Sequence, residues 1–194
     1  MCDTVDFTTA FARLLVDPAL RRTYRHKPAV VARQLAVAEN QRKAFCNLDP
    51  DNLERQAAGL ISKRRYEVAR IIPQTWNRLT VAEESALFQN HAIAYWPTGH
   101  KRHQQDAVEF CRFLIRHDKR LVVRSEFNWL RFRLGHHWVR IHCTRDLILD
   151  GQLHSGIQFC YRWRGKARWY AYGVPTHPSP VDHHQHRSTP RQTT

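Results

Sequence analysis

The fold is decided near the C-terminal end of the chain, by the segments His137-Trp-Val-Arg-Ile-His-Cys143, Gly156-Ile-Gln-Phe-Cys-Tyr-Arg-Trp163, Arg164-Gly-Lys166 and Ala167-Arg-Trp-Tyr-Ala-Tyr-Gly173. Apolar and polar residues alternate along the three longer segments, which is the period of a β-strand. The short segment, centred on a glycine, is typical of a hairpin turn. These segments therefore predict a small three-stranded antiparallel sheet, with an acidic connection from Asp146 to Gly156 between its first two strands.

The alternation also divides the side chains of each strand between the two faces of the sheet. On the middle strand one row is Ile157, Phe159, Tyr161 and Trp163, and the other is Gln158, Cys160, Arg162 and Arg164. On the last strand Ala167, Trp169 and Ala171 oppose Arg168, Tyr170 and Tyr172. We expect the Ile-Phe-Tyr-Trp row to pack on the helices.

The chain before the sheet has the pattern of helices interrupted by proline and Asx residues. The expected helices run from Thr4 or Asp6 to Val16, from Asp17-Pro18, from Lys27-Pro28, from Glu39 to Asn47, from Asp49-Pro50 to about Ile71, from Thr80 to about Trp96 and from Gln104 to His117. Aspartate as N-cap followed by proline is a favoured helix start, and Pro73 is a stop. Residues 119–134 fit a strand from Leu121 or a helix that ends at Gly135, and we predict the helix.

The predicted fold is therefore α+β, in three parts. An N-terminal multi-helix bundle of about seven helices occupies residues 1–135, and the small antiparallel sheet occupies residues 136–174. Residues 175–194 are predicted to be a disordered C-terminal tail, because prolines among Thr, Ser, His and Gln cannot form a core.

Composition restricts the function without choosing it. The chain has 31 Lys and Arg against 17 Asp and Glu, a formal net charge of +14, which attracts nucleic acid, an anionic membrane or an acidic protein. Five widely spaced cysteines without a C-x-x-C pair argue against a disulfide framework or a zinc ribbon. We find no signal-peptide pattern and no apolar stretch long enough to span a bilayer, so we expect a cytoplasmic protein that does not contact a membrane.

No combination of side chains in the sequence predicts catalysis. Ser-His-Asp and Cys-His-Asn contexts, paired carboxylates and a glycine-rich phosphate loop are all missing. The histidine cluster of residues 183–186 falls in the predicted tail, and His137 and His142 point to opposite faces of a strand, so neither group predicts a metal site. We therefore predict a binding protein that is not an enzyme and has no metal or cofactor of its own.

The sheet is the candidate binding site. A three-stranded sheet has two edges with unpaired backbone groups, and such an edge can accept an extended peptide as an added strand. Nearby arginines would then hold acidic side chains of the peptide. The candidate peptide-binding residues are Trp138, Arg140, Phe159, Arg162, Trp169 and Tyr170.

Three alternatives stay open. The aromatic residues can simply form a core beneath a covered edge, or the chain can be a structural helical adaptor. A single-stranded nucleic acid can also stack on aromatics interleaved with arginine. The sequence lacks the RNA-recognition signature and a convincing helix-turn-helix, so nucleic acid is the less favoured partner.

Four strings in the helical region resemble a known pattern: Phe11-Ala-Arg-Leu-Leu-Val-Asp-Pro-Ala-Leu20, Lys27-Pro-Ala-Val-Val31, Phe45-Cys-Asn-Leu-Asp49 and Leu53-Glu-Arg-Gln-Ala-Ala-Gly-Leu-Ile-Ser-Lys-Arg-Arg65. The pattern occurs in small proteins that partner multinuclear non-haem iron enzymes in making modified ribosomal peptides. Together with the basic, aromatic sheet, residues 5–173 look most like the MbnC-like partner proteins of methanobactin biosynthesis. A similar helical pattern occurs in the small, non-catalytic subunit of some extradiol dioxygenases.

The resemblance implies a heterodimer with a multinuclear iron oxidase subunit (MbnB-like). That enzyme oxidises cysteines of a precursor peptide (MbnA-like) to oxazolone and thioamide groups of a copper-chelating product. The present chain would bind the leader of the precursor, as a strand added to the sheet, and help form the substrate cleft. The iron would belong to the partner enzyme. The family has no strict motif to carry over residue by residue, so the candidate residues rest on the predicted sheet.

Overall fold

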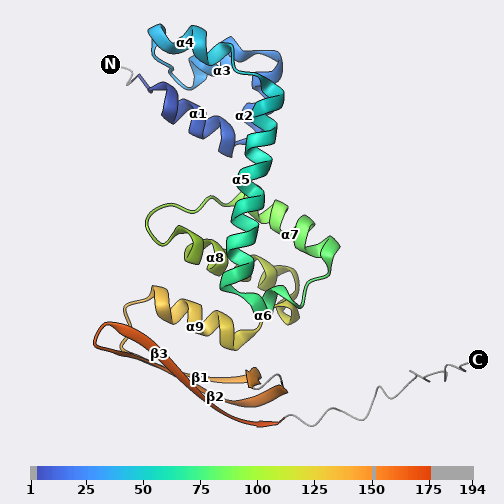
Figure 1. The fold of residues 1–194 in the computed structure, drawn as a ribbon, viewed down its shortest axis with the longest axis vertical. Helices are drawn as coiled ribbons and strands as arrows, with labels where there is room; N and C mark the ends of the chain where they lie inside the picture. Colours follow the sequence, from blue (N-terminus) through green and yellow to red (C-terminus); the bar gives the residue numbers. More distant parts are fainter. Residues whose placement is uncertain (1–3, 150–151, 176–194) are drawn as a thin grey trace, which may run out of the picture.

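The structure, a computed structural model, describes residues 4–149 and 152–175. Within them, helices fill the first part of the chain and a three-stranded antiparallel sheet ends it (Figure 1), so the predicted α+β fold is confirmed. The predicted tail of residues 175–194 is wrong at its first residue, since Pro175 ends the last strand. Residues 176–194, with the histidine cluster of residues 183–186, lie outside the described residues.

The helices begin and end close to the predicted positions. They are α1 Phe7–Val16, α2 Pro18–His26, α3 Pro28–Gln34, α4 Glu39–Cys46, α5 Pro50–Ile71, α6 Pro73–Trp76, α7 Val81–Ala94, α8 Arg102–Asp118 and α9 Arg124–Leu134, with a 3-10 helix η1 at Lys119–Leu121. The carboxylate of Asp17 accepts the N–H groups of Ala19 and Leu20, so it caps α2 as expected. Pro73 ends α5 but also starts α6, one turn that the sequence did not predict, since proline is tolerated in the first turn of a helix.

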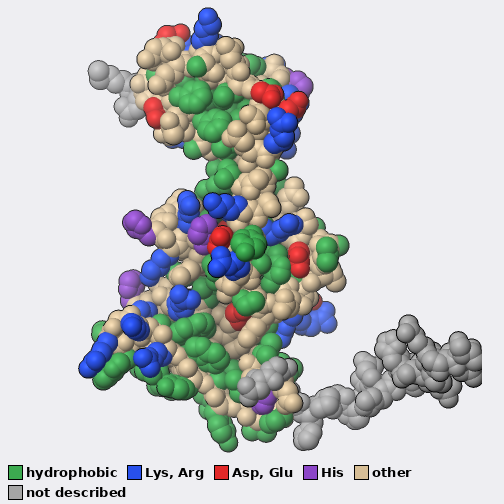
Figure 2. Space-filling view, viewed as in Figure 1, with side chains coloured by type: hydrophobic (Ala, Val, Ile, Leu, Met, Phe, Trp, Pro, Cys, Tyr) green, Lys and Arg blue, Asp and Glu red, His purple; other side chains and the backbone are tan. Residues whose placement is uncertain are grey.

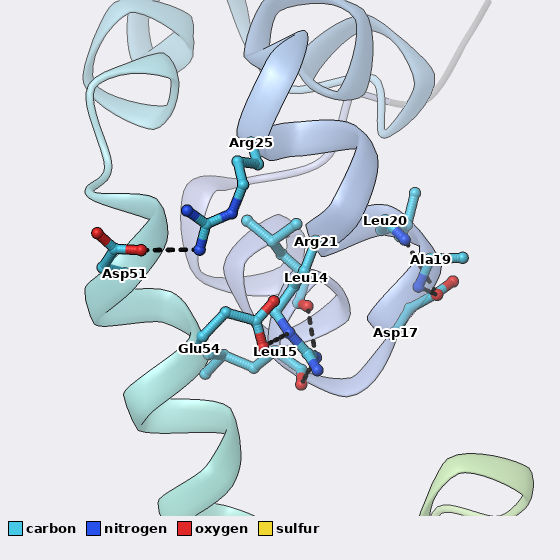
Figure 3. A network of polar contacts seen from close by, with 9 residues as sticks. All are labelled: Leu14, Leu15, Asp17, Ala19, Leu20, Arg21, Arg25, Asp51 and Glu54. Carbon is cyan, nitrogen blue, oxygen red and sulfur yellow. Dashed lines mark hydrogen bonds and ion pairs between the residues drawn. The ribbon is translucent and has the colours of Figure 1, made fainter.

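The first helices, α1 to α4, form an N-terminal lobe with its own core (Figure 1). At its centre the rings of Tyr24 and Phe45 meet edge to face at 5.6 Å, and the Tyr24 hydroxyl donates to the Phe45 carbonyl at 2.5 Å. Arg21 on α2 lies between Glu54 on α5, at 3.1 Å, and the carbonyl of Leu15 at the end of α1, at 2.5 Å (Figure 3). This arginine joins the lobe to α5, because its charge is satisfied by groups from both.

Helix α5 runs from the N-terminal lobe into a second core formed with α6 to α9 (Figure 1). In this core Arg64 donates from Nε and Nη2 to the two oxygens of Asp106, at 2.9 and 2.8 Å, and His91 Nε2 lies 2.9 Å from Asp106 Oδ1. Although burial raises the pKa of Asp106, the hydrogen bonds from His91 and Arg64 outweigh it and lower the pKa overall. The buried carboxylate therefore stays ionised and fixes α5, α7 and α8 to one another.

The sheet is longer than predicted. Its strands are β1 Val139–Leu149, β2 Gln152–Trp163 and β3 Lys166–Pro175, in the order β1-β2-β3. The acidic connection expected from Asp146 to Gly156 is wrong, since most of it extends the two strands, with a shift of register between Thr144 and Leu147. The predicted turn is confirmed: Arg164 and Gly165 both have positive φ, 48° and 75°, as a tight two-residue hairpin requires.

Two glycines face each other where β2 and β3 come closest. Gly156 pairs with Gly173, and a Cβ on Gly156 would lie 2.0 Å from the Tyr172 carbonyl oxygen. No side chain fits there without moving the backbone. The two glycines therefore allow β2 and β3 to approach each other closely at the end of the hairpin away from its turn.

Our expectation of which face of the sheet packs on the helices is wrong. Helix α9 packs against the row Gln158, Cys160 and Arg162, of which Gln158 and Cys160 are fully buried. The row of Ile157, Phe159, Tyr161 and Trp163, which we expected to face the helices, lies on the opposite side. We call the side against α9 the inner face and the other the outer face.

Candidate binding surfaces of the sheet

The inner face is held to α9 by hydrogen bonds and ring contacts. Gln158 Nε2 donates to the Ser125 carbonyl at 2.9 Å. Arg162 Nη2 donates to the carbonyl of Gly135 at 3.1 Å, at the end of α9, where backbone oxygens have no partner within the helix. The Trp169 ring lies 6.4 Å from that of Trp129. This face is therefore occupied by the protein itself.

The outer face is apolar and open to solvent. The pairing register places residues of all three strands on it: Val139, Ile141 and Cys143 of β1, Ile157, Phe159, Tyr161 and Trp163 of β2, and Tyr170 and Tyr172 of β3. Ile141 is 63% exposed, Trp163 62% and Tyr172 79%. Contiguous apolar surface of this kind is uncommon on a monomer and marks an interaction site.

The aromatic rings at the centre of this face stack on one another. Phe159 and Tyr161 lie 5.7 Å apart, and Tyr161 and Tyr170 lie 5.8 Å apart with an interplanar angle of 7°. The side-chain hydrogen bond with Tyr170 raises the pKa of Tyr161, so the Tyr161 phenol stays neutral at physiological pH. The rings thus form one block rather than separate platforms.

Beside this block lies a hollow of about 580 Å³. Trp138, Val139, Phe159 and Trp163 line it, together with Tyr161, Arg162 and Arg164. It is lined almost entirely by apolar atoms, so it suits an apolar side chain of a partner rather than a polar ligand.

Cationic side chains gather at the hairpin end of the sheet. No Asp or Glu occurs in residues 152–175, whereas Arg164, Lys166 and Arg168 lie in and beside the turn. Among the ion pairs found between described residues, none involves these three side chains. Figure 2 shows Lys and Arg gathered at the lower left, where the hairpin turns in Figure 1, next to hydrophobic side chains. This end of the sheet attracts acidic groups.

Among the described residues, backbone groups on the edge of β3 that faces away from β2 have no strand partner. Arg162 N–H donates to the Trp138 carbonyl at 2.8 Å, on the side of β1. In an antiparallel ladder, alternate residues point to opposite sides of the strand, so Tyr161 bonds to its partner Arg168 on β3. The β3 residues between those bonded positions direct their N–H and C=O groups away from β2: Ala167, Trp169, Ala171 and Gly173.

The two edges of the sheet differ. All ten residues of β3 pair in an unbroken register with β2. The register of β1 is interrupted between Thr144 and Leu147, and there Asp146 Oδ2 accepts the Arg124 N–H at 2.8 Å, at the start of α9. A bulge and a neighbouring helix disfavour added strands, so β3 is the better acceptor edge.

The structure divides the candidate peptide-binding residues between these surfaces. Phe159 and Tyr170 lie on the outer face, with Trp138 at its rim. Arg140, Arg162 and Trp169 have inner-face positions, although Trp169 is 39% exposed and belongs to the β3 edge. Arg140, on β1 at the opposite edge of the sheet, contacts His137, which precedes that strand. The six residues therefore do not form one site.

The residues that make the outer face continuous were not predicted as candidate binding residues: Val139, Ile141, Ile157, Tyr161, Trp163 and Tyr172. The predicted turn already indicated which face of the sheet is exposed. A two-residue hairpin pairs Trp163 with Lys166 and Tyr161 with Arg168. Since two cations at adjacent outer positions belong in water, the register alone assigns their aromatic neighbours to the solvent side.

Metal-binding groups and membrane-spanning helices are both absent from the described part of the chain. No group of three or more His, Cys, Asp and Glu there could hold a metal ion, and no helix there is long and apolar enough to cross a membrane. Cys143 and Cys160, which the sequence placed on neighbouring strands, lie on opposite faces, Cys143 exposed and Cys160 buried. Burial raises the pKa of Cys160 to about 11, so that thiol stays neutral.

No protein-family model, curated protein or solved structure matches the chain.

Proposed function

We propose that the chain is a non-catalytic subunit of a heterodimeric iron-dependent oxidase complex, in which it binds the leader of a ribosomally made precursor peptide. The proposal follows the resemblance to the MbnC-like proteins. It assigns the complex to methanobactin biosynthesis, where cysteines of the precursor become oxazolone and thioamide groups. The iron belongs to the partner enzyme, and the complex works in the cytoplasm.

The observation that carries the proposal is the free edge of β3. Four consecutive outward-directed positions, from Ala167 to Gly173, offer the backbone groups that an extended peptide pairs with. Lys166 and Arg168 on the same strand favour a peptide with acidic side chains. Trp169 and Tyr170 flank the edge on the two faces, where alternate side chains of an added strand would lie.

Single-stranded nucleic acid is the second candidate. The observation in its favour is the set of exposed aromatic rings on the outer face beside Arg164, Lys166 and Arg168. Such binding would weaken steeply and log-linearly with salt, whereas a backbone-paired peptide would be less sensitive.

The test is a tagged pull-down of the full chain from its native host, washed at roughly 0.5 M salt to remove nonspecific phosphate contacts. Mass spectrometry, metal analysis and nuclease-treated absorbance would identify what remains. We expect a stoichiometric iron-bearing protein together with a short peptide. Nucleic acid without such a protein would overturn the proposal in favour of the second candidate.

A pair of proline variants tests the edge. Ala171→Pro removes an N–H that points away from β2, so the sheet should keep its ladder while the peptide loses a partner. Ile141→Pro makes the same change on the free side of β1. We expect the Ala171→Pro bait to retain the iron protein and lose the peptide, and the Ile141→Pro bait to retain the peptide. Equal peptide recovery from the two baits would exclude β3 as the acceptor edge.

A further inference from the structure

A strand added to β3 would contact only the outer-face side chains next to that edge, because the side chains stand perpendicular to the sheet while the peptide would extend the sheet sideways. It nevertheless presents an apolar centre, a hollow and a cationic end. Three kinds of partner could cover this surface: a second copy of the chain, a nucleic acid or a different protein.

A second copy of the chain is a poor fit. Two outer faces brought together would place the hairpin cations Arg164, Lys166 and Arg168 of each copy against a protein of net charge +14, with no carboxylate in residues 152–175 to offset them. Like charges facing each other in an interface cost several kcal/mol. The residues beyond the sheet also fit poorly, since positions 176–194 contain no aromatic residue and Val181 as their one aliphatic side chain.

Nucleic acid fits less well than protein. Base stacking needs the flat side of a ring to be free, whereas Tyr161 stacks on both Phe159 and Tyr170. The remaining apolar outer positions are the aliphatic Val139, Ile141 and Ile157 in addition to the exposed rings of Trp163 and Tyr172. Aliphatic side chains around a packed aromatic block are typical of the core of a protein–protein interface.

We propose that the outer face of the sheet is the docking surface for a different protein, whose complementary surface has an apolar centre and acidic residues opposite Arg164, Lys166 and Arg168. An apolar side chain of that protein fills the hollow beside Trp138 and Trp163. This assignment rests on the proposed function in one respect: the docked protein is the oxidase subunit, so the enzyme covers the outer face while the leader extends the sheet at the neighbouring edge of β3.

Cys143 provides a built-in reporter. Its thiol is exposed on the outer face opposite Ile157, while Cys46 lies partly buried in the N-terminal lobe and Cys111 and Cys160 are buried. In a Cys2→Ser background, maleimide labelling of the full chain is measured residue by residue, free and in the complex recovered by the pull-down. We expect labelling of Cys143 to fall by about tenfold in the complex, as for a site closed to solvent, with Cys46 unchanged.

Two glutamate variants test the docking surface directly. Ile157→Glu places a charge at the centre of the outer face and should weaken recovery of the partner by about 30-fold. Ile93→Glu makes the same change at an exposed isoleucine of α7 and should leave recovery unchanged. Circular dichroism and thermal unfolding of both variants verify that the fold is intact.

The outcomes separate the two proposals. A recovered protein without iron that protects Cys143 and is lost with Ile157→Glu supports the docking surface and overturns the oxidase complex. An iron protein that leaves Cys143 reactive and survives Ile157→Glu overturns the docking surface alone. A dimer of the purified chain that Ile157→Glu dissociates, measured by sedimentation, overturns it in favour of a second copy. Oligothymidylate binding that is lost with Tyr170→Ala, measured by anisotropy, overturns it in favour of nucleic acid.

Discussion

The inner and outer faces of the sheet differ in a direction opposite to that of most proteins. On β2 the buried row contains Gln158 and Arg162, and the exposed row contains Ile157 and Phe159. Polar residues are ordinarily on the solvent side. The comparison teaches that the polarity of a row does not decide its burial when the neighbouring element needs hydrogen-bond donors.

Helix α9 is the element that needs these hydrogen-bond donors. Its chain ends at Leu134 with carbonyl groups that lack partners inside the helix, and Arg162 donates to two of them, those of Phe132 and Gly135. On β3 the inner positions Ala167 and Ala171 are small, which leaves room for the helix. A matched set of donors and small side chains therefore places α9 on the inner face, and the apolar row is left exposed to solvent.

The largest difference between the two faces is expected in the unfolding free energy of variants that place a glutamate on one face or on the other. Cys160→Glu buries a charge in a fully enclosed position and should lower the free energy of unfolding by about 3–5 kcal/mol. Ile157→Glu, on the outer face, should change it by less than about 1 kcal/mol. Denaturant titration of both variants provides the comparison. A large loss with Ile157→Glu would mean that the outer face is part of the core of the isolated chain.

The next effect concerns the anchor of the inner face. Arg162→Glu removes a donor from two carbonyls of α9 and places a negative charge beside them, so we expect a loss of about 2–4 kcal/mol in unfolding free energy. The sequence analysis chose Arg162 as a peptide contact, and leader affinity of a folded variant tests that role. Arg168→Glu, on the exposed outer row, is the matched control and should cost less than about 0.5 kcal/mol. Equal losses would deny Arg162 its role in holding α9.

A smaller effect is expected where β2 and β3 approach each other most closely, at Gly156 and Gly173. Gly156→Ala places a Cβ 2.0 Å from the Tyr172 carbonyl oxygen, and the backbone shift should cost about 1–3 kcal/mol. Gly59→Ala makes the identical change in the middle of α5, where nothing lies within 4 Å, and should stabilise the protein by about 0.5–1 kcal/mol. Thermal unfolding should therefore move in opposite directions for the two variants. A shift of the same sign in both would show that the close approach is not constrained.

Local rules predicted most of the elements. Asp17-Pro18 and Asp49-Pro50 start α2 and α5 because cap and proline act within one turn. Arg164-Gly165 forms the hairpin because a two-residue turn needs positive φ at both positions, which Gly165 adopts without strain. The helix predicted within residues 119–134 is confirmed as α9, although Gly135 at its end has an extended backbone (φ −80°) and is not the left-handed glycine cap on which the prediction relied.

What the sequence did not give depends on contacts between distant residues. The burial of Gln158 reflects a bond to Ser125, 33 positions away, and the extension of β1 through Asp146 reflects its contact with Arg124. The candidate site was predicted as one cluster because period-2 alternation assigns residues to faces but not faces to neighbours. The pairing of Tyr161 with Arg168 was the one local clue to the correct assignment.

The smallest expected effect reports on desolvation of the inner face. His142 lies there on β1, its Nε2 is buried without a hydrogen-bond partner among the described residues, and burial, followed by the charges of Arg140 and Arg131, lowers its pKa from 6.5. The unfolded chain therefore takes up this proton first as the pH falls below 6.5, and the folded state loses stability until the pH passes the lower, folded pKa. Between about pH 7.5 and pH 5.5, the melting temperature of the wild type should fall by roughly 1–2 °C more than that of His142→Gln. His100→Gln, at an exposed position, should follow the wild type, and a wild-type curve parallel to that of His142→Gln would place His142 in solvent rather than against α9.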